Sequence, residues 1–211
     1  MSPQLAAGRP HVGIAGAGLA GRLLAWRLLR RGARVSLFDA GRRDDRGSAG
    51  PTAAAMLSPT AELAVADAHI HALGMRSLEL WQQWLGALHA QTGQQVYFRR
   101  EGTLVVAHAP DRGALTHYAG LLQAHLPAGE AAASLRSLDS AGIGELEPLL
   151  AGRFAQGLFL PQEGQLANDQ LYAALAAALD SGLAACGGAW HEQCPIESVQ
   201  PRAVLAADGT R

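Results

Sequence analysis

Two short apolar segments flank a longer amphipathic one near the start of the chain. Residues 12–15 and 35–38 are apolar runs of strand length, and between them apolar side chains recur at helical spacing from Leu19 to Leu29. Gly32 is expected to terminate that helix. Four arginines are expected on its solvent face and at its C-terminal end: Arg22, Arg27, Arg30 and Arg31. The pattern predicts a strand, a helix and a second, parallel strand.

Further helices and strands alternate along the rest of the chain. Helical periodicity predicts helices over residues 61–90, 111–126, 139–147 and 168–180. Alternating or continuous apolar runs predict strands over residues 96–100, 103–107, 157–160, 190–199 and 203–206. Gly74 is expected to break the first helix, Asn168 to cap the last one, and Glu101-Gly102 to join the first two strands. Residues 41–50 are expected to form a loop, and residues 128–137 a loop or a short edge strand.

Three glycines lie between the first strand and the first helix in the spacing G-x-G-x-x-G. Gly16 would form the tight turn, Gly18 would leave room for a pyrophosphate, and Gly21 would let the helix pack on the strand. The backbone of Leu19 and Ala20 would then present helix N–H groups to the phosphates. This spacing predicts a site for an ADP-containing dinucleotide; a glycine loop that only packs the two strands and the helix is the alternative.

An acid, Asp39, ends the second strand. A carboxylate at this position accepts hydrogen bonds from an adenosine ribose, with Ala40 beside it, and would repel a 2′-phosphate. NADP is therefore disfavoured, although Arg42 and Arg43 lie close by in the sequence and an arginine can hold such a phosphate.

Composition excludes several function classes. The chain has 211 residues and a formal net charge of −1, which argues against a nucleic-acid partner. No apolar run reaches bilayer length, and the first residues lack a signal-peptide pattern. Cys186 and Cys194 make neither a disulfide framework nor a metal-ligand set, and His69 and His71 would point apart on a helix. We expect a cytoplasmic protein with no membrane partner and no metal.

Several segments together resemble the D-amino acid oxidase family of FAD-dependent oxidoreductases, and within it the glycine oxidases of thiamine biosynthesis. Besides GAGLAG at residues 16–21, they are TAAAMLSPTAE at 52–62, YFRREGTLVVA at 97–107, GLFLPQEGQLANDQLYAALAAAL at 157–179 and AWHEQCPIESVQ at 189–200. The second of these is similar to a hairpin of the family's substrate domain, and the last to a strand that lies against the adenine.

The resemblance implies an α/β fold, α+β overall: a Rossmann-like FAD-binding domain with an inserted, mostly antiparallel β substrate domain. Residues 1–90 would form the first part of the FAD-binding domain, residues 91–160 the first part of the substrate domain, and residues 161–211 the return to the FAD-binding domain. FAD, not NAD, is the implied cofactor. Residues implied to bind it, beyond the glycine loop, Asp39 and Ala40, are Ser48, Thr52, Ala54, Ala55, Met56 and Ile196.

The implied reaction is amine oxidation. A hydride passes from the substrate Cα to flavin N5, water hydrolyses the imine, and O₂ reoxidises the flavin to give H₂O₂. Partners would be a small amino acid or amine and O₂, with a homo-oligomer left open. Met56 is interpreted as lining either the active site or the core. Ala55 departs from the family, which often carries glycine just before this methionine.

The catalytic residues themselves are expected beyond Arg211, because the family's carboxylate-binding arginine and active-site tyrosine follow this point. The chain is thus expected to be the N-terminal part of a longer enzyme and not competent alone. Two alternatives stay open: the flavin module of a D-amino acid dehydrogenase or tRNA-modifying flavoenzyme, and an inactive truncated product. Arg99 or Arg100 would either face a substrate cavity or form a surface pair.

Overall fold

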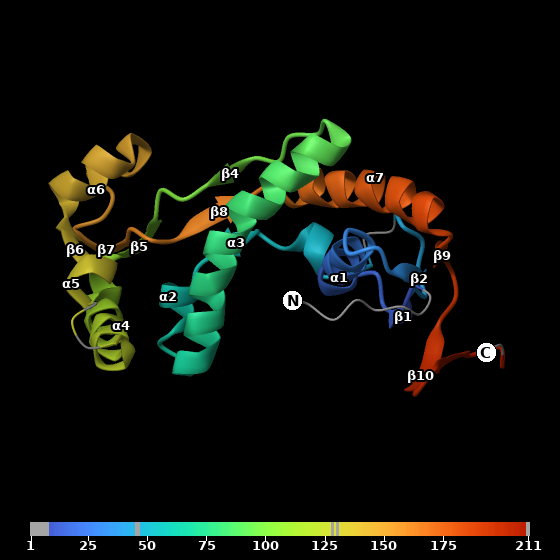
Figure 1. Ribbon diagram of the computed structural model, residues 1–211. Coiled ribbons are helices and arrows are strands. Elements are labelled where there is room, and N and C mark those ends of the chain that lie inside the picture. The colour runs from blue at the N-terminus through green and yellow to red at the C-terminus, as the bar shows by residue number, and fades with distance from the viewer. Residues whose placement is uncertain (1–8, 45–46, 128, 130, 210–211) are drawn as a thin grey trace, which may run out of the picture. The chain divides into compact units, whose positions relative to one another are not determined.

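The computed structural model describes residues 9–44, 47–127, 129 and 131–209 (Figure 1). The chain divides into two compact units. The first unit comprises Met1–Ala54, Gly86–Val96 and Ala167–Arg211, and the second comprises Ala55–Leu85 and Tyr97–Leu166. The two units interrupt each other in sequence. The domain boundaries expected near residues 90 and 160 stay predictions.

A parallel sheet forms the centre of the first unit. Its strands β1 (His11–Ala15), β2 (Arg34–Phe38) and β9 (Ala189–His191) lie in the order β1-β2-β9. Ile14 is paired with Leu37, and Leu37 in turn with Trp190. Helix α1 (Leu19–Leu29) connects the first two strands. The predicted strand–helix–strand unit is therefore confirmed, and a later segment of the chain widens its sheet.

Two helices pack on this sheet. Helix α7 (Asn168–Cys186) packs against α1, and both contact β2. Trp26 of α1 is fully buried, and its indole N–H donates to Gln91 Oε1 at 2.9 Å. Gln91 lies near the end of α3 (Ala68–Thr92), and its amide donates to Ala178 O of α7 at 3.1 Å. The Gln91 side chain thus links α1, α3 and α7 and satisfies the indole N–H of the fully buried Trp26.

A short helix and a hairpin complete the first unit. Residues Gly50–Thr52 form the 3₁₀ helix η1, which contacts α7. Strands β10 (Ile196–Gln200) and β11 (Ala203–Ala206) pair antiparallel.

The second unit holds two three-stranded antiparallel sheets among the described residues. One has the order β3 (Met56–Leu57), β8 (Gly164–Leu166), β4 (Phe98–Arg99). The other has the order β5 (Thr103–Ala107), β7 (Gln156–Leu160), β6 (Arg136–Asp139). The remaining elements are the first part of α3 together with α2 (Pro59–Glu62), η2 (Ala109–Asp111), α4 (Arg112–His125), α5 (Ala131–Ser134), α6 (Ser140–Leu146) and η3 (Pro148–Leu150).

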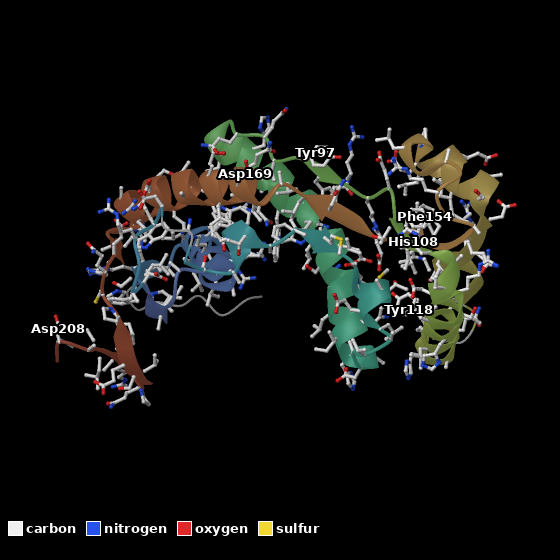
Figure 2. All side chains as sticks on the ribbon, turned by 180° about the vertical axis from the view of Figure 1, so that it is seen from behind. Tyr97, His108, Tyr118, Phe154, Asp169 and Asp208 are labelled. Carbon is white, nitrogen blue, oxygen red and sulfur yellow. The ribbon has the colours of Figure 1, made fainter. Side chains whose placement is uncertain are left out.

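Leucines from separate segments build a core of the second unit. Leu63, Leu122, Leu126 and Leu160 form one buried cluster. Tyr118 packs against it and donates its hydroxyl hydrogen to Ala61 O at 2.8 Å. In the same unit the rings of His108 and Phe154 lie 4.9 Å apart (Figure 2).

Two expectations about the second unit are wrong. The strands on either side of Glu101-Gly102 form no hairpin, because β4 pairs with β8 while β5 pairs with β7. Gly74 does not break a helix but lies inside α3, where an added Cβ would be 2.5 Å from Pro59 Cβ. The chain instead leaves the helical path between α2 and α3. Gly74 therefore serves close packing and not termination.

Four details of the predicted elements also differ from expectation. The N-cap of α7 is Ala167, while Asn168 begins the helix and its amide donates to Ala53 O. The helix continues past Asp180 to Cys186, where Gly187 ends it in the left-handed conformation. The single strand expected over residues 190–199 is two strands, β9 and β10, separated by a turn. Residues 131–134 form a helical turn before the edge strand β6.

None of the described helices is both long and apolar enough to cross a membrane.

Glu163 is a fully buried carboxyl group in the turn between β7 and β8. Its Oε1 accepts from the backbone N–H of Ala61 at 2.6 Å, at the start of α2. Burial raises the pKa of this carboxyl, and the hydrogen bond from Ala61 only partly opposes the shift. Its folded-state pKa therefore lies above its unfolded-state pKa. The stability linked to Glu163 is complete below the unfolded pKa and is lost as the pH rises through the folded pKa.

We expect Glu163→Gln to remove this loss, because the neutral amide still offers an oxygen to Ala61. As the pH rises from the unfolded pKa through the folded pKa, the unfolding free energy of the native protein should fall relative to the variant. The fall is about 1.4 kcal/mol for each unit by which the pKa is raised. Urea unfolding at several pH values measures it, with the exposed Glu145→Gln as control. Parallel curves for the native protein and Glu163→Gln would contradict the assignment.

Candidate functional site

The glycine loop lies at the carboxyl ends of β1 and β2, where α1 begins. Gly16 has a φ of +96°, and its N–H donates to Phe38 O at 2.8 Å. A left-handed φ of this kind favours glycine. A Cβ on Gly21 would lie 1.9 Å from Gly16 O, so the helix reaches the turn only because residue 21 has no side chain. The roles predicted for these two glycines match the geometry.

Gly18 is the N-cap of α1 and leaves the helix end open. It has an ordinary extended conformation and makes no side-chain capping bond. A Cβ added to Gly18 would meet no atom within 4 Å. The first N–H groups of a helix have no acceptor within it, and together with the helix dipole they favour an anion. Leu19 and Ala20 begin α1 directly after this open position.

Asp39 ties the glycine loop to the segment that follows β2. Its Oδ2 accepts from the N–H of Ala17 at 2.6 Å, and its Oδ1 accepts from the N–H of Gly41 at 2.8 Å. A carboxylate has about four acceptor positions, so both oxygens keep capacity for a further donor such as a ribose hydroxyl. The carboxylate therefore shapes the loop as well as offering a ligand contact.

The turn after β9 continues the pairing with the segment after β2. The N–H of Asp39 donates to His191 O at 3.0 Å, and the N–H of Cys194 donates back to Asp39 O at 2.8 Å. Gln193 takes a left-handed φ of +54° between them, and its N–H donates to Gly41 O at 3.0 Å. This turn brings Cys194 and the start of β10 next to the glycine loop, a position that the family resemblance implies for Ile196 but hydrophobic periodicity does not indicate.

Two adjoining pockets result, and both are lined by Asp39 and Ala40. The first, of about 320 Å³, is otherwise lined chiefly by Gly16, Phe38, Cys194 and Ile196. The second, of about 350 Å³, is otherwise lined chiefly by Ala17, Arg22, Arg42 and Ser48. The structure thus places Gly16, Asp39, Ala40, Ser48 and Ile196 around these two pockets, and their role in binding the cofactor stays a prediction. The first pocket has a more apolar than polar lining, and the second is lined by Ala17, two residues before α1, and by two arginines.

Arg22 is a residue of this site that the sequence pattern misplaced. It was expected on the solvent face of α1, but only 4% of it is exposed. Its Nε donates to Ala17 O at 2.7 Å and its Nη2 to Arg43 O at 2.8 Å. The guanidinium lies over the rings of Tyr172 and Trp190, at 4.6 and 4.8 Å from their centroids. Burial lowers the pKa of Arg22, and the nearby Tyr172 and Asp39 oppose that shift.

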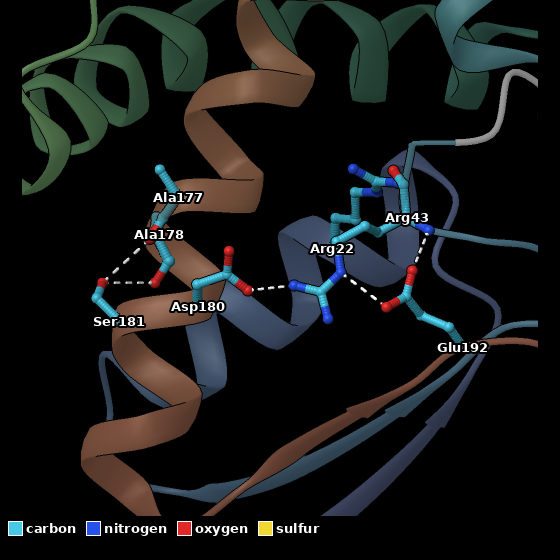
Figure 3. A network of polar contacts seen from close by, with 7 residues as sticks. All are labelled: Arg22, Arg43, Ala177, Ala178, Asp180, Ser181 and Glu192. Atoms are coloured by element: carbon cyan, nitrogen blue, oxygen red, sulfur yellow. Dashed lines mark hydrogen bonds and ion pairs between the residues drawn. The ribbon is translucent and has the colours of Figure 1, made fainter.

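Arg43 connects this layer to α7 and to the turn after β9 (Figure 3). Its guanidinium pairs with Asp180 at 2.5 Å and Glu192 at 3.0 Å and lies over Trp190. The backbone N–H of Arg43 also donates to Glu192 at 2.6 Å, and this bond holds the pKa of Glu192 below its usual value. Arg43 is thus committed to carboxylates of the protein itself.

Four other residues predicted to contact the cofactor do not line these two pockets. Thr52 turns back on its own loop, where its hydroxyl donates to Ala49 O at 3.0 Å. Ala54 is exposed in the first unit. Ala55 and Met56 belong to the second unit, in which Met56 pairs with Gln165 and is 61% exposed. Met56 is therefore not part of the core that the described residues form. For Thr52, Ala54, Ala55 and Met56 the cofactor role stays a prediction.

Other candidate groups make only local contacts. His71 is buried with its Nε2 3.4 Å from Thr60 Oγ1, and the described part of the chain holds no cluster of three or more metal-binding side chains. Cys186 and Cys194 are unpaired. Arg99 pairs with Glu101 at 3.2 Å on the surface of the second unit and lines a pocket of about 290 Å³ there.

Comparison with known proteins identifies the family. Residues 11–211 match the family model described as DAO, FAD dependent oxidoreductase. The chain belongs to the DAO family of FAD-dependent oxidoreductases. It is 36% identical over 168 residues to ThiO of Rhizobium etli, named as a thiamine biosynthesis oxidoreductase. That match covers 79% of this chain and 45% of the relative, so the chain spans less than half of that relative's length.

Solved structures show the same fold. The glycine oxidase of Geobacillus kaustophilus matches with a TM-score of 0.73 at 22% identity, over 93% of this chain and 51% of that one. Iminodiacetate oxidase from Chelativorans sp. BNC1 matches with a TM-score of 0.71 at 23% identity, over 94% and 51% respectively. The expected α/β FAD-binding fold is therefore confirmed, and so is FAD as the cofactor of this DAO-family chain.

The residues at the site fit the ADP half of FAD. The diphosphate needs hydrogen-bond donors and close backbone approach, and the open N-terminus of α1 at Gly18 supplies both. The ribose needs an acceptor, which Asp39 offers. The adenine ring fits the largely apolar first pocket beside Phe38 and Ile196.

The structure predicts opposite outcomes for two glycine-to-alanine substitutions. Gly21→Ala forces a Cβ against Gly16 O and should lower the unfolding free energy by about 1–3 kcal/mol. Gly18→Ala meets open space and should cost less than about 1 kcal/mol, the value of the N-cap preference. It should nevertheless weaken FAD binding tenfold or more, because its methyl group occupies the approach of the pyrophosphate. Urea unfolding and FAD titration measure the two effects.

In this pair each variant is the control of the other. Equal losses of stability, or unaltered FAD affinity in Gly18→Ala, would contradict the assigned division between packing and ligand approach.

Ala55 adopts a left-handed φ of +56°, the conformation for which glycine is suited. This conformation costs an alanine about 1–2 kcal/mol, whereas glycine loses about 0.5–1 kcal/mol more backbone entropy on folding. Ala55→Gly should therefore stabilise the protein by about 0.5–1 kcal/mol in urea unfolding. Ala54→Gly, the neighbouring control without a positive φ, should not stabilise it. A destabilised Ala55→Gly would contradict the backbone assignment.

Proposed function

We propose that this chain supplies the FAD-binding part of an amine-oxidising enzyme of the glycine oxidase type. The substrate is a small amino acid or secondary amine such as glycine or sarcosine. The observation that carries the proposal is the coincidence of an ADP-binding site with 36% identity to ThiO of Rhizobium etli. The neighbouring folds named as glycine oxidase and iminodiacetate oxidase support an amine substrate.

The residues of the first unit take separate roles in this proposal. The backbone of Gly18, Leu19 and Ala20 binds the diphosphate, and Ser48 donates to it from the second pocket. Asp39 accepts from the ribose, and the first pocket holds the adenine. Thr52, Ala54, Ala55 and Met56 follow toward the flavin ring, where Met56 offers an exposed side chain to the substrate side.

When bound, FAD would supply the two-electron acceptor for oxidation of the amine, and O₂ would reoxidise it with release of H₂O₂. This chain contributes cofactor binding and orientation. We also propose a cytoplasmic location, supported by the unpaired Cys186 and Cys194.

The test uses the full-length protein. Purified protein should show flavin absorbance and release FAD on denaturation, and glycine or sarcosine should produce H₂O₂ in a peroxidase-coupled assay. A protein that takes up no FAD, or that binds FAD without being reduced by any small amine under anaerobic conditions, would overturn the proposal. Reduction by the amine followed by transfer to a dye but not to O₂ would identify a dehydrogenase in place of an oxidase.

A further inference from the structure

Arg22 stands out in the cofactor site because its charge is buried and its donors are used within the protein. The side chain lies on the first turn of α1, directly after Gly21, and lines the second pocket. Its two bonded nitrogens reach backbone carbonyls from different segments: Ala17 O in the glycine loop and Arg43 O after β2. These acceptors lie 26 positions apart in the sequence numbering (43 − 17).

The two segments joined by Arg22 are walls of the same pocket. Ala17 lines it from the glycine loop, and Arg42 lines it from the segment after β2. Asp39 joins the same segments a second time, through the N–H groups of Ala17 and Gly41. The N–H of Ala17 is thus held by the Asp39 carboxylate, and its carbonyl oxygen by the Arg22 guanidinium.

Two aromatic rings flank the Arg22 guanidinium, and carboxylates anchor the neighbouring Arg43. The Arg22 guanidinium carbon lies over Tyr172 of α7 and Trp190 of β9, and the guanidinium of Arg43 also lies over the Trp190 ring. Arg43 is itself anchored by Asp180 and Glu192 (Figure 3). Arginine combines a planar surface for stacking with donors in a fixed fork, which lysine lacks. The arrangement therefore depends on the guanidinium and not only on its charge.

We propose that Arg22 is a positioning residue for the ADP half of FAD. It fixes the separation between the glycine loop and the segment after β2 before the cofactor arrives, so that binding costs little ordering of either segment. The inference rests on the proposed placement of the ADP half in these pockets. It goes beyond that placement because it assigns the pre-organisation of the site to Arg22. In this role Arg22 does not need to contact FAD itself.

The test compares Arg22→Met and Arg22→Lys with Arg31→Met in the full-length protein. Arg31 is exposed just after the same helix and gives a matched loss of one cation. FAD and ADP dissociation constants are measured by calorimetry on apo-protein, well below each variant's melting temperature. Both Arg22 variants should bind FAD and ADP at least tenfold more weakly, with no rescue by lysine, while Arg31→Met stays within twofold of the native protein.

Amide hydrogen exchange of the apo-protein separates positioning from general loss of structure. In the Arg22 variants the amides of residues 16–20 and 41–44 should exchange faster, while those of β1 and β2 keep their protection. If Arg22→Met fails to fold, Arg22→Lys decides. Native affinity for FAD and ADP in Arg22→Lys would overturn the inference. A native protein that binds neither FAD nor ADP would overturn the proposed placement, and the inference with it.

Discussion

The close approach of helix α1 to the turn after β1 is the constraint on which the first unit depends. Gly21 lies so near Gly16 that any side chain at residue 21 would overlap the Gly16 carbonyl. The approach points the helix N-terminus at the carboxyl edge of the sheet, where its unsatisfied N–H groups can bind an anion. It also places the next residue, Arg22, under the loop and not in solvent. Packing and ligand recognition thus follow from one contact between backbones.

Charged groups of the first unit already have hydrogen-bond or ion-pair partners within the protein, without a ligand. Asp39 accepts from two backbone N–H groups, and Arg22 donates to two backbone carbonyls. Arg43, close to the ribose acceptor in sequence, pairs with Asp180 and Glu192. A buried ionic group is costly unless it is paired and hydrogen-bonded. These pairings account for the buried Arg22, and they withdraw Arg43 from the role of a 2′-phosphate ligand.

Local sequence patterns predicted the elements well where one periodicity continued without interruption. The strands around α1, the glycine turn and helix α4 agree with their hydrophobic spacing. Errors arose where a residue's local preference yielded to a distant contact. Gly74 accommodates Pro59 and does not break its helix, and Asn168 turns its amide to Ala53 and does not cap α7. The strands beside Gly102 pair with β7 and β8, which come more than fifty residues later.

The sequence by itself determined the glycine turn, the acid after β2 and the class of ligand, because spacing within a single strand–helix–strand unit dictates where a helix N-terminus and a carboxylate meet. Tertiary structure decided how the walls of the site are built, although the family resemblance had already implied Ser48 and Ile196 as cofactor contacts. Cys194 and Ile196 reach Asp39 through a left-handed turn at Gln193, and Arg22 is buried by Tyr172 and Trp190 from segments about 150 residues away or more. Such contacts depend on strand order and helix packing, which bring remote residues together and leave no periodic trace along the chain.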